Sequence, residues 1–205
     1  MKKYFIDCGA HCGESILTAK QRFGLDTHVI SFEPIPFFAN QLMEIYKDEP
    51  TVQILNAAVW INNDIKKFYV SYQYTDASSL VIDGRTDTST FIDVPCFDLS
   101  EWIKETFSKD DHIILKLDIE GAEYEVLNKM INDNTICMIK ELWGEWHDRK
   151  LDNPKEIEFA NSIYSVLREK NITLNTWEIH IPTIGKSHPL LAYRPKTLEG
   201  NIGNE

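Results

Sequence analysis

The chain of 205 residues carries a formal net charge of −11, and 43% of its side chains are hydrophobic. That length suits one globular domain with a sizeable core, and no stretch is apolar enough to cross a membrane. So acidic a chain repels phosphate backbones, which disfavours nucleic acid as a partner. None of the four cysteines stands in a C-x-x-C pair, and we expect reduced thiols and a cytoplasmic location.

The N-terminal part of the chain has the pattern of a β-α-β unit. Residues 4–8 form a short apolar run, residues 13–23 have helical spacing, and residues 28–32 form a second apolar run. The first run leads into two glycines four residues apart, and the second leads into Glu33. Ligands of open α/β sheets bind where such strands end, so this unit predicts a nucleotide cleft.

The residues that follow the two apolar runs suit a particular ligand. Gly9 permits a sharp turn, and Gly13 lets a helix begin close to a ligand, with free N–H groups pointing at it. The carboxylate of Glu33 can accept hydrogen bonds from both hydroxyls of a ribose. Because the loop lacks the Gly-x-Gly-x-x-Gly spacing of dinucleotide sites, S-adenosylmethionine (SAM), which has no phosphate, fits it better. A plain strand–loop–helix turn with a stray acid is the alternative.

The rest of the chain continues to alternate between strands and helices. Further strands are expected at 52–55, 65–74, 90–97, 112–117 and 135–142, and helices at 37–47, 122–131 and 154–170. A shorter helix should begin near Asp98 or Ser100, either of which can cap it. The aromatic and β-branched stretches 65–74 and 90–97 indicate a β-rich insertion after the third strand, lying over one edge of the sheet.

The end of the chain decides the fold class. Residues 172–180 and 189–194 are predicted to form an antiparallel closing hairpin, which is typical of methyltransferase sheets rather than nicotinamide-binding ones. We therefore predict a Rossmann-like, doubly wound α/β fold with a mostly parallel seven-stranded sheet. One domain should cover residues 1–195, followed by a polar tail at 196–205.

A second acidic motif follows the strand at 112–117. Asp118 and Glu120 precede Gly121, and the end of this strand should lie beside that of the first strand, across the point where ligands bind. Acids that stabilise a helix N-terminus are the alternative explanation, worth roughly 0.3–1 kcal/mol. That explanation accounts for Glu120 and Glu123 better than for Asp118, which sits at a buried strand end.

These motifs together resemble the FkbM-like family of SAM-dependent methyltransferases. The strings F-I-D-C-G-A-H-C-G-E-S, F-E-P, N-A-A-V, A-S-S-L, F-D-L-S-E-W-I and L-K-L-D-I-E-G-A-E-Y-E-V-L occur in the order typical of that family, from about residue 4 to residue 142. The K-x-D-x-E-G-A-E string is its most specific part. The resemblance implies a class I methyltransferase that transfers a methyl group from SAM to a hydroxyl of a sugar, a glycan or a related natural product.

The resemblance also implies which residues bind SAM. The predicted cofactor-binding residues lie at the ends of the first four strands and in the insertion: Asp7, Gly9, Ala10, His11, Gly13, Glu14, Ser15, Glu33, Pro34, Asn56, Ala57, Ser78, Ser79 and Asp118. His11 and Cys12 depart from the family pattern, which more often has Asn and an aliphatic residue there. Many relatives carry extra N-terminal segments over the site, so we expect either an open site or a domain of a larger polypeptide.

The residues that act on the acceptor are less sharply defined. Asp118, Glu120, Glu145 and His147 are the candidate catalytic residues, and an ordinary histidine pKa near 6.5 favours His147 as general base. A divalent metal, Mg²⁺ or Mn²⁺, held by Asp118, Glu145 and His147 is the other option. The tryptophans at 143 and 146 either stack on a sugar or cap the core.

Two other function classes remain open. The chain could be a catalytically silent SAM-binding domain, although its full set of acids and glycines argues against decay. A nicotinamide-dependent oxidoreductase is less favoured, because the dinucleotide loop is missing. The acceptor is expected to be a small molecule or a glycan.

Overall fold

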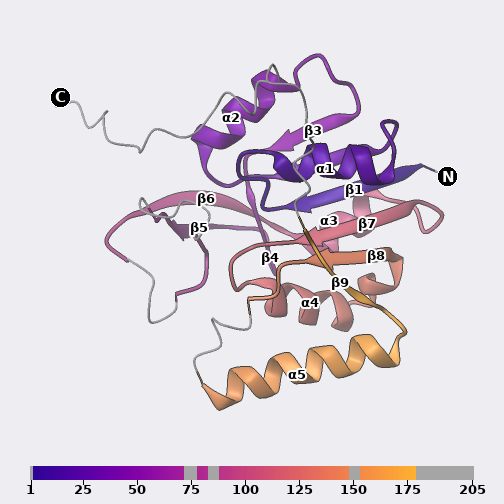
Figure 1. The fold of residues 1–205 in the computed structure, drawn as a ribbon. Helices are drawn as coiled ribbons and strands as arrows, with labels where there is room; N and C mark the ends of the chain where they lie inside the picture. Colours follow the sequence, from indigo (N-terminus) through magenta and orange to yellow (C-terminus); the bar gives the residue numbers. More distant parts are fainter. Residues whose placement is uncertain (1, 72–77, 83–87, 148–152, 179–205) are drawn as a thin grey trace.

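The computed structural model describes residues 2–71, 78–82, 88–147 and 153–178. Its larger sheet has six strands in the order β3-β2-β1-β7-β8-β9, all parallel. They are β1 (Lys3–Cys8), β2 (His28–Phe32), β3 (Val52–Leu55), β7 (His112–Leu117), β8 (Ile139–Gly144) and β9 (Leu174–Thr176). Figure 1 shows this sheet with helices packed around it. The predicted doubly wound α/β fold is confirmed.

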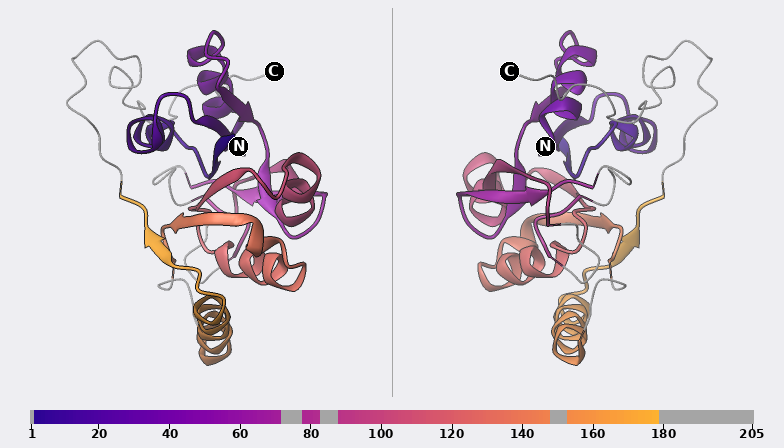
Figure 2. Two further views of the ribbon diagram at one scale, coloured as in Figure 1. Left: turned by 90° about the vertical axis from the view of Figure 1, so that its right-hand side faces the viewer. Right: turned by 90° about the vertical axis from the view of Figure 1, so that its left-hand side faces the viewer.

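The helices follow the strands in the expected alternation. They are α1 (Glu14–Phe23), α2 (Pro36–Ile45), α3 (Leu99–Thr106), α4 (Glu123–Asn132) and α5 (Pro154–Glu169). Asp98 caps α3, since its side chain accepts a hydrogen bond from the Glu101 N–H, and Gly24 ends α1. Figure 2 shows α1 and α2 apart from α4 and α5, with the sheet between the two groups.

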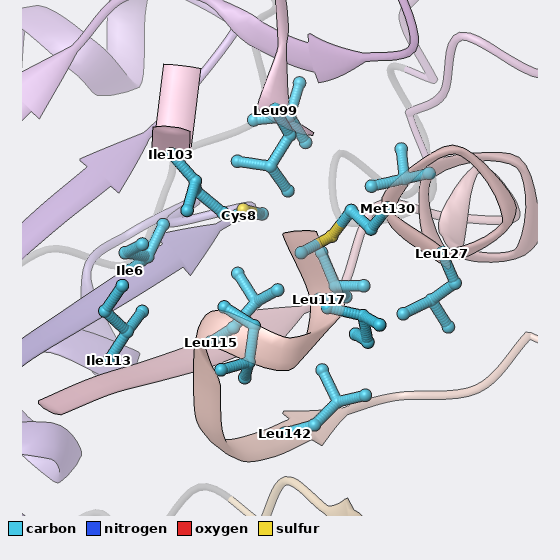
Figure 3. Packing of buried hydrophobic residues seen from close by; sticks show 14 of the residues in the cluster. Ile6, Cys8, Leu99, Ile103, Ile113, Leu115, Leu117, Leu127, Met130 and Leu142 are labelled. Carbon is cyan, nitrogen blue, oxygen red and sulfur yellow. The ribbon is translucent and has the colours of Figure 1, made fainter. Parts of the chain in front are cut away.

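Alternate residues of the strands face two separate cores. Ile6, Ile30 and Leu115 point toward α3, α4 and α5, whereas Phe5 and Val29 point toward α1 and α2. All of these side chains are less than one-tenth exposed. Figure 3 shows the first core, where the strand residues meet Leu99, Ile103, Leu127 and Met130 from the helices. Strands covered on both faces explain why the sequence has unbroken apolar runs here.

The insertion after β3 forms a sheet of its own. It contains β4 (Ala58–Trp60), β5 (Asp64–Tyr69) and β6 (Phe91–Asp98) in the order β4-β6-β5, with β5 antiparallel to β6. A cluster of apolar residues that includes Phe38 of α2 and Phe68 of β5 packs this sheet against the domain. The predicted β-rich insertion is therefore present, although β4 was not expected.

Two features differ from the expectation at the C-terminal side. Residues Thr135–Met138 form the short 3₁₀ helix η2, so the predicted strand at 135–142 begins only at Ile139. β9 is shorter than the predicted strand 172–180 and pairs with β8 in parallel. The seventh strand and the antiparallel hairpin are not confirmed, because residues 189–194 and the tail at 196–205 lie outside the described residues. In the described part, no helix is both long and apolar enough to cross a membrane.

Strand register brings the carboxyl ends of the central strands to one level. Cys8 is the partner of both Phe32 and Leu117, and Leu117 is the partner of Gly144. The residues that follow these ends therefore meet at one edge of the sheet. Gly9 has φ +97°, and an added Cβ would lie 2.0 Å from the backbone oxygen of Asp118. This glycine is thus needed for contact between two loops, not only for the turn that the sequence predicted.

We predict that Gly9→Ala strongly reduces the free energy of unfolding, because neither the backbone angle nor the Asp118 carbonyl leaves room for a methyl group. Gly24→Ala is the matched control. Gly24 has a similar φ of +109°, but its added Cβ would meet the end of the Asp26 side chain, which can move. Urea unfolding of both variants should show the larger loss for Gly9→Ala, and equal losses would contradict the proposed loop contact.

Candidate active site

A buried lysine joins the loops at this edge of the sheet. Lys116 of β7 is 2% exposed, and its Nζ lies 3.1 Å from Asp7 Oδ1 and 3.2 Å from Asp118 Oδ2. The same Nζ donates a hydrogen bond of 2.8 Å to the Gly9 carbonyl. Burial alone would lower the pKa of Lys116, but the charges of Asp7 and Asp118 outweigh it and hold the pKa above its ordinary value. Lys116 is therefore a cation that fixes both loops.

Asp7 takes part in this network from inside the protein. Its side chain is fully buried, and Oδ2 accepts hydrogen bonds from Ser15 of α1 and Ser31 of β2. Asp7 and Lys116 are also direct partners in the register of β1 and β7. Asp7 and Ser15 were both predicted to bind the cofactor. Their described contacts are with each other and with buried neighbours, which gives them the role of supporting the β1–α1 loop from the protein interior.

The loop between β1 and α1 is shaped by its backbone. The N–H groups of Gly9 and Ala10 both donate to the Phe32 carbonyl, and Gly13 has φ +83°. An added Cβ on Gly13 would lie 2.5 Å from the Leu42 side chain, so α1 packs closely on α2. Glu14 is the first residue of α1, whose N-terminus has no side-chain cap, which leaves backbone N–H groups suited to a ligand carboxylate.

Glu33 directly follows β2, and its side chain contacts the loop between β1 and α1. It is 4% exposed, and its two carboxylate oxygens accept hydrogen bonds from the backbone N–H groups of His11 and Ile35, at 2.7 and 2.8 Å. Burial raises the pKa of Glu33 to about 7, despite the opposing effect of these two N–H groups. Each oxygen keeps a second lone pair, so the carboxylate can still accept hydrogen bonds from a diol.

His11 and the β3 loop flank Glu33. His11 has a positive φ of +46°, and its ring packs on Phe38 at a centroid distance of 4.5 Å. Asn56 donates hydrogen bonds to the backbone oxygens of Glu33 and Pro34, which ties the two loops together. Ala57 is buried against the core below them. These residues surround the place predicted for the adenosine.

One of the two predicted serines of the insertion contacts the acidic loop after β7. Ser79 Oγ donates a hydrogen bond of 2.7 Å to the Glu120 carbonyl, and Ser78 Oγ accepts one from the Ser71 N–H. Both serines are buried. Ser79 thus attaches the insertion to the loop that carries Glu120, which has a positive φ of +57°, whereas Ser78 bonds within the insertion.

His147 follows β8 and is fully buried between acids. Its Nδ1 lies 2.8 Å from Glu123 Oε1, and its Nε2 lies 3.1 Å from Glu120 Oε1 and 3.7 Å from Glu145 Oε1. Burial would lower the pKa of His147, but the negative charges of the adjacent Glu120 and Glu123 carboxylates and the contact of Nδ1 with Glu123 outweigh it and raise the pKa to about 10. The imidazole of the ligand-free protein is thus protonated at neutral pH, unlike the general base expected from an ordinary histidine pKa.

The structure brings most of the predicted acidic residues together. Ligand-type atoms of Asp118, Glu120 and His147 lie within 4.8 Å of one another. Glu145, predicted as a metal ligand in place of Glu120, is next to this cluster but its side chain is 51% exposed. Trp143 packs in a core cluster with Phe23 and Trp177 and under the guanidinium of Arg22, so it is not a sugar-stacking surface.

Sequence reasoning missed two residues of the site. Lys116 stands in the apolar run of β7, where a buried cation requires anionic partners, and that mismatch was a usable signal. Glu123 was assigned to the start of a helix, yet it is fully buried and accepts hydrogen bonds from the N–H groups of Ile119 and Gly121. No local pattern distinguishes it from an ordinary acid in the first turn of a helix.

Comparisons with known proteins identify the family and the fold. A family model described as the methyltransferase FkbM domain matches residues 7–174. A crystal structure of methyltransferase FkbM from Methylobacillus flagellatus KT aligns with a TM-score of 0.51 at 16% identity, covering 80% of this chain and 37% of that one. Yeast methylglyoxal/isovaleraldehyde reductase with NADPH aligns with a TM-score of 0.40 at 8% identity, covering 86% and 56%. A comparison with curated proteins gave no match.

We predict that Lys116→Met lowers the free energy of unfolding by about 3–5 kcal/mol, because it leaves Asp7 buried without its cation. Lys47→Met is the control: Lys47 pairs with Glu44 on the surface, where both side chains are more than half exposed, so that variant should change stability by less than about 1 kcal/mol. Adding Asp7→Asn to Lys116→Met should restore part of the loss. Urea unfolding measures all three, and no recovery in the double variant would contradict the charge explanation.

Proposed function

Because the chain belongs to the FkbM methyltransferase family, we propose that this methyltransferase transfers a methyl group from SAM to a hydroxyl of a sugar, a glycan or a related natural product. The observation that carries the proposal is the placement of Glu33 across the β1–α1 loop from Asp118 and Glu120, all at the carboxyl ends of neighbouring strands.

The residues present fit SAM. The carboxylate of Glu33 would accept the ribose hydroxyls, and the loop at Gly9 to Gly13 would support the methionine part, with the uncapped start of α1 facing its carboxylate. Asn56 and Ala57 would border the adenine. When bound, SAM supplies an electrophilic methyl group on a sulfonium and leaves as S-adenosylhomocysteine (SAH).

The chain's own task is to align the acceptor and to receive its proton. Asp118 is held by Lys116 and is 24% exposed, so its carboxylate is both fixed and reachable. Glu120 is positioned by the Ser79 bond to its backbone. Either carboxylate would accept the proton of an acceptor hydroxyl held against the methyl group, and alignment of the two reacting atoms would supply much of the rate enhancement. The family resemblance, rather than the geometry, supports a sugar as acceptor.

The proposal is tested first by calorimetric titration of the chain with SAH in buffer that contains EDTA. We expect one molecule to bind per chain. Turnover is then measured with labelled SAM on a panel of glycosides and hydroxylated small molecules. Absence of SAH binding would overturn the proposal, while binding without turnover on any acceptor would favour a silent SAM-binding domain.

Glu33→Ala should weaken SAH binding at least about tenfold, since hydrogen bonds to a charged group are worth about 1.5–3 kcal/mol. In the unaltered chain the affinity should fall about tenfold from about pH 8 to about pH 6. The reason is that the ionised form binds the diol better, and a pKa of about 7 makes that form scarce at low pH. Glu33→Gln is the matched control, because it should bind weakly at every pH in this range. An unchanged affinity in Glu33→Ala would refute the ribose assignment.

Asp118→Ala should lower turnover by roughly 10²–10⁴-fold with the acceptor found in the panel, because it removes a candidate proton acceptor. SAH binding and the thermal melting curve are measured in parallel, since Lys116 also loses a partner in this variant. Full turnover in a folded Asp118→Ala variant would exclude this residue from proton transfer.

A further inference from the structure

The cluster of Asp118, Glu120 and His147 has the composition of a metal site. One oxygen from each acid and one imidazole nitrogen lie within 4.8 Å of one another, a spacing that one ion could bridge. The side chains are graded in exposure: Asp118 is 24% exposed, Glu120 is 12% exposed and His147 is fully buried. The group is thus anchored on its inner side and open to water on its outer side.

Glu123 determines which nitrogen of His147 faces the cluster. The carboxylate of Glu123 accepts hydrogen bonds from the N–H groups of Ile119 and Gly121 at 2.9 Å each, which fixes its position inside the protein. Its Oε1 is also 2.8 Å from His147 Nδ1. A carboxylate only accepts hydrogen bonds, so Nδ1 carries the proton, and a neutral imidazole directs the lone pair of Nε2 toward Asp118 and Glu120.

The Nε2 atom of His147 is not satisfied by the protein alone. It lies 3.1 Å from Glu120 Oε1, but among the described residues it has no partner that meets hydrogen-bond geometry, and it is shielded from solvent. The Nε2 lone pair and the adjacent Glu120 carboxylate repel each other. A second proton on the ring, or a metal ion held there together with Asp118, which also pairs with Lys116, would relieve this repulsion.

We propose that Asp118, Glu120 and His147 bind a divalent cation of the Mg²⁺ and Mn²⁺ class. Two carboxylates are the ligands that these hard ions prefer, and a single imidazole is compatible with Mn²⁺ in particular. The pair of Glu123 and His147 has the arrangement in which a buried carboxylate orients a metal-binding imidazole. Glu120 takes the place that sequence analysis gave to Glu145, which lies farther out.

The position of the site gives the ion a role in the reaction. It lies beside Asp118, at the strand ends where the acceptor hydroxyl is expected, and a divalent ion there lowers the pKa of such a hydroxyl. This role rests on the proposed methyltransferase reaction, whereas the site itself rests on the geometry of its three ligands.

The test is titration of the EDTA-treated and desalted full chain with Mn²⁺, following the free ion by electron paramagnetic resonance. We expect one Mn²⁺ per chain, displaced by excess Mg²⁺. In NMR spectra of the unaltered chain, substoichiometric Mn²⁺ should broaden the imidazole signals of His147 before those of His112. This second measurement does not depend on the folding of any variant.

Glu120→Gln should weaken Mn²⁺ binding at least about tenfold and Glu123→Gln by about 10–100-fold, since loss of an orienting carboxylate has effects of that size. Glu141→Gln is the matched control. Glu141 also lies beside a histidine, 3.3 Å from His112 Nε2. Within the described residues this pair is not part of a cluster of three candidate ligands, so the variant should leave Mn²⁺ binding unchanged. Thermal melting establishes that each variant is folded.

The outcomes separate the metal site from the proposed function. Lack of Mn²⁺ binding at millimolar concentration, or binding that Glu120→Gln does not weaken, overturns the metal site and leaves His147 as a protonated clamp between two acids. SAH binding in EDTA together with no Mn²⁺ binding would then keep the methyltransferase function without the ion. Mn²⁺ binding at His147 without SAH binding would keep the site and overturn the function.

Discussion

The candidate site depends on one buried ammonium group. Lys116 has nearly no exposed surface, so its charge requires the carboxylates of Asp7 and Asp118. These acids come from different strands, and the lysine also holds the carbonyl of Gly9. A single cation thereby joins the loop assigned to the cofactor and the loop assigned to the acceptor. Such an arrangement is a poor source of net stability, but it fixes the relative position of two loops that apolar packing alone would hold less tightly.

The parallel sheet supplies the frame in which this network is possible. Its central strands end at one level, so the residues that follow them converge without long connecting segments. The apolar residues of the central strands pack into two cores, so helices cover both faces of the sheet. Acidic residues follow the strand ends at Glu33, Asp118 and Glu145, next to the buried charges of Asp7 and Lys116 near the ends of β1 and β7. This concentration of charge at one edge of an otherwise apolar sheet marks the candidate site.

Strands, helices and acidic site residues could be predicted from the sequence wherever the local residue pattern matches the burial seen in the structure. The strands β2, β3 and β7 have the predicted bounds, because each is a short, largely apolar run followed by a polar residue: Glu33, Asn56 and Asp118. Apolar character alone did not separate a 3₁₀ turn at Thr135–Met138 from the strand that follows it. Lys116 and Glu123 were missed for another reason. A lysine in an apolar run signals buried acidic partners but does not identify them, and the contact of Glu123 with His147 joins two separate elements.

The contact between Gly9 and the carbonyl of Asp118 has a consequence for protein engineering. The backbone of the β1–α1 loop at Gly9 lies directly against the backbone of the loop after β7 at Asp118, with no side chain between them. A shift of the backbone in one loop therefore requires a matching shift in the other. A chimera that takes the β1–α1 loop from a relative must also take the segment after β7, or the interlocking surfaces will not match. Exchange of acceptor specificity by recombination is therefore restricted to crossovers that keep these two distant segments together.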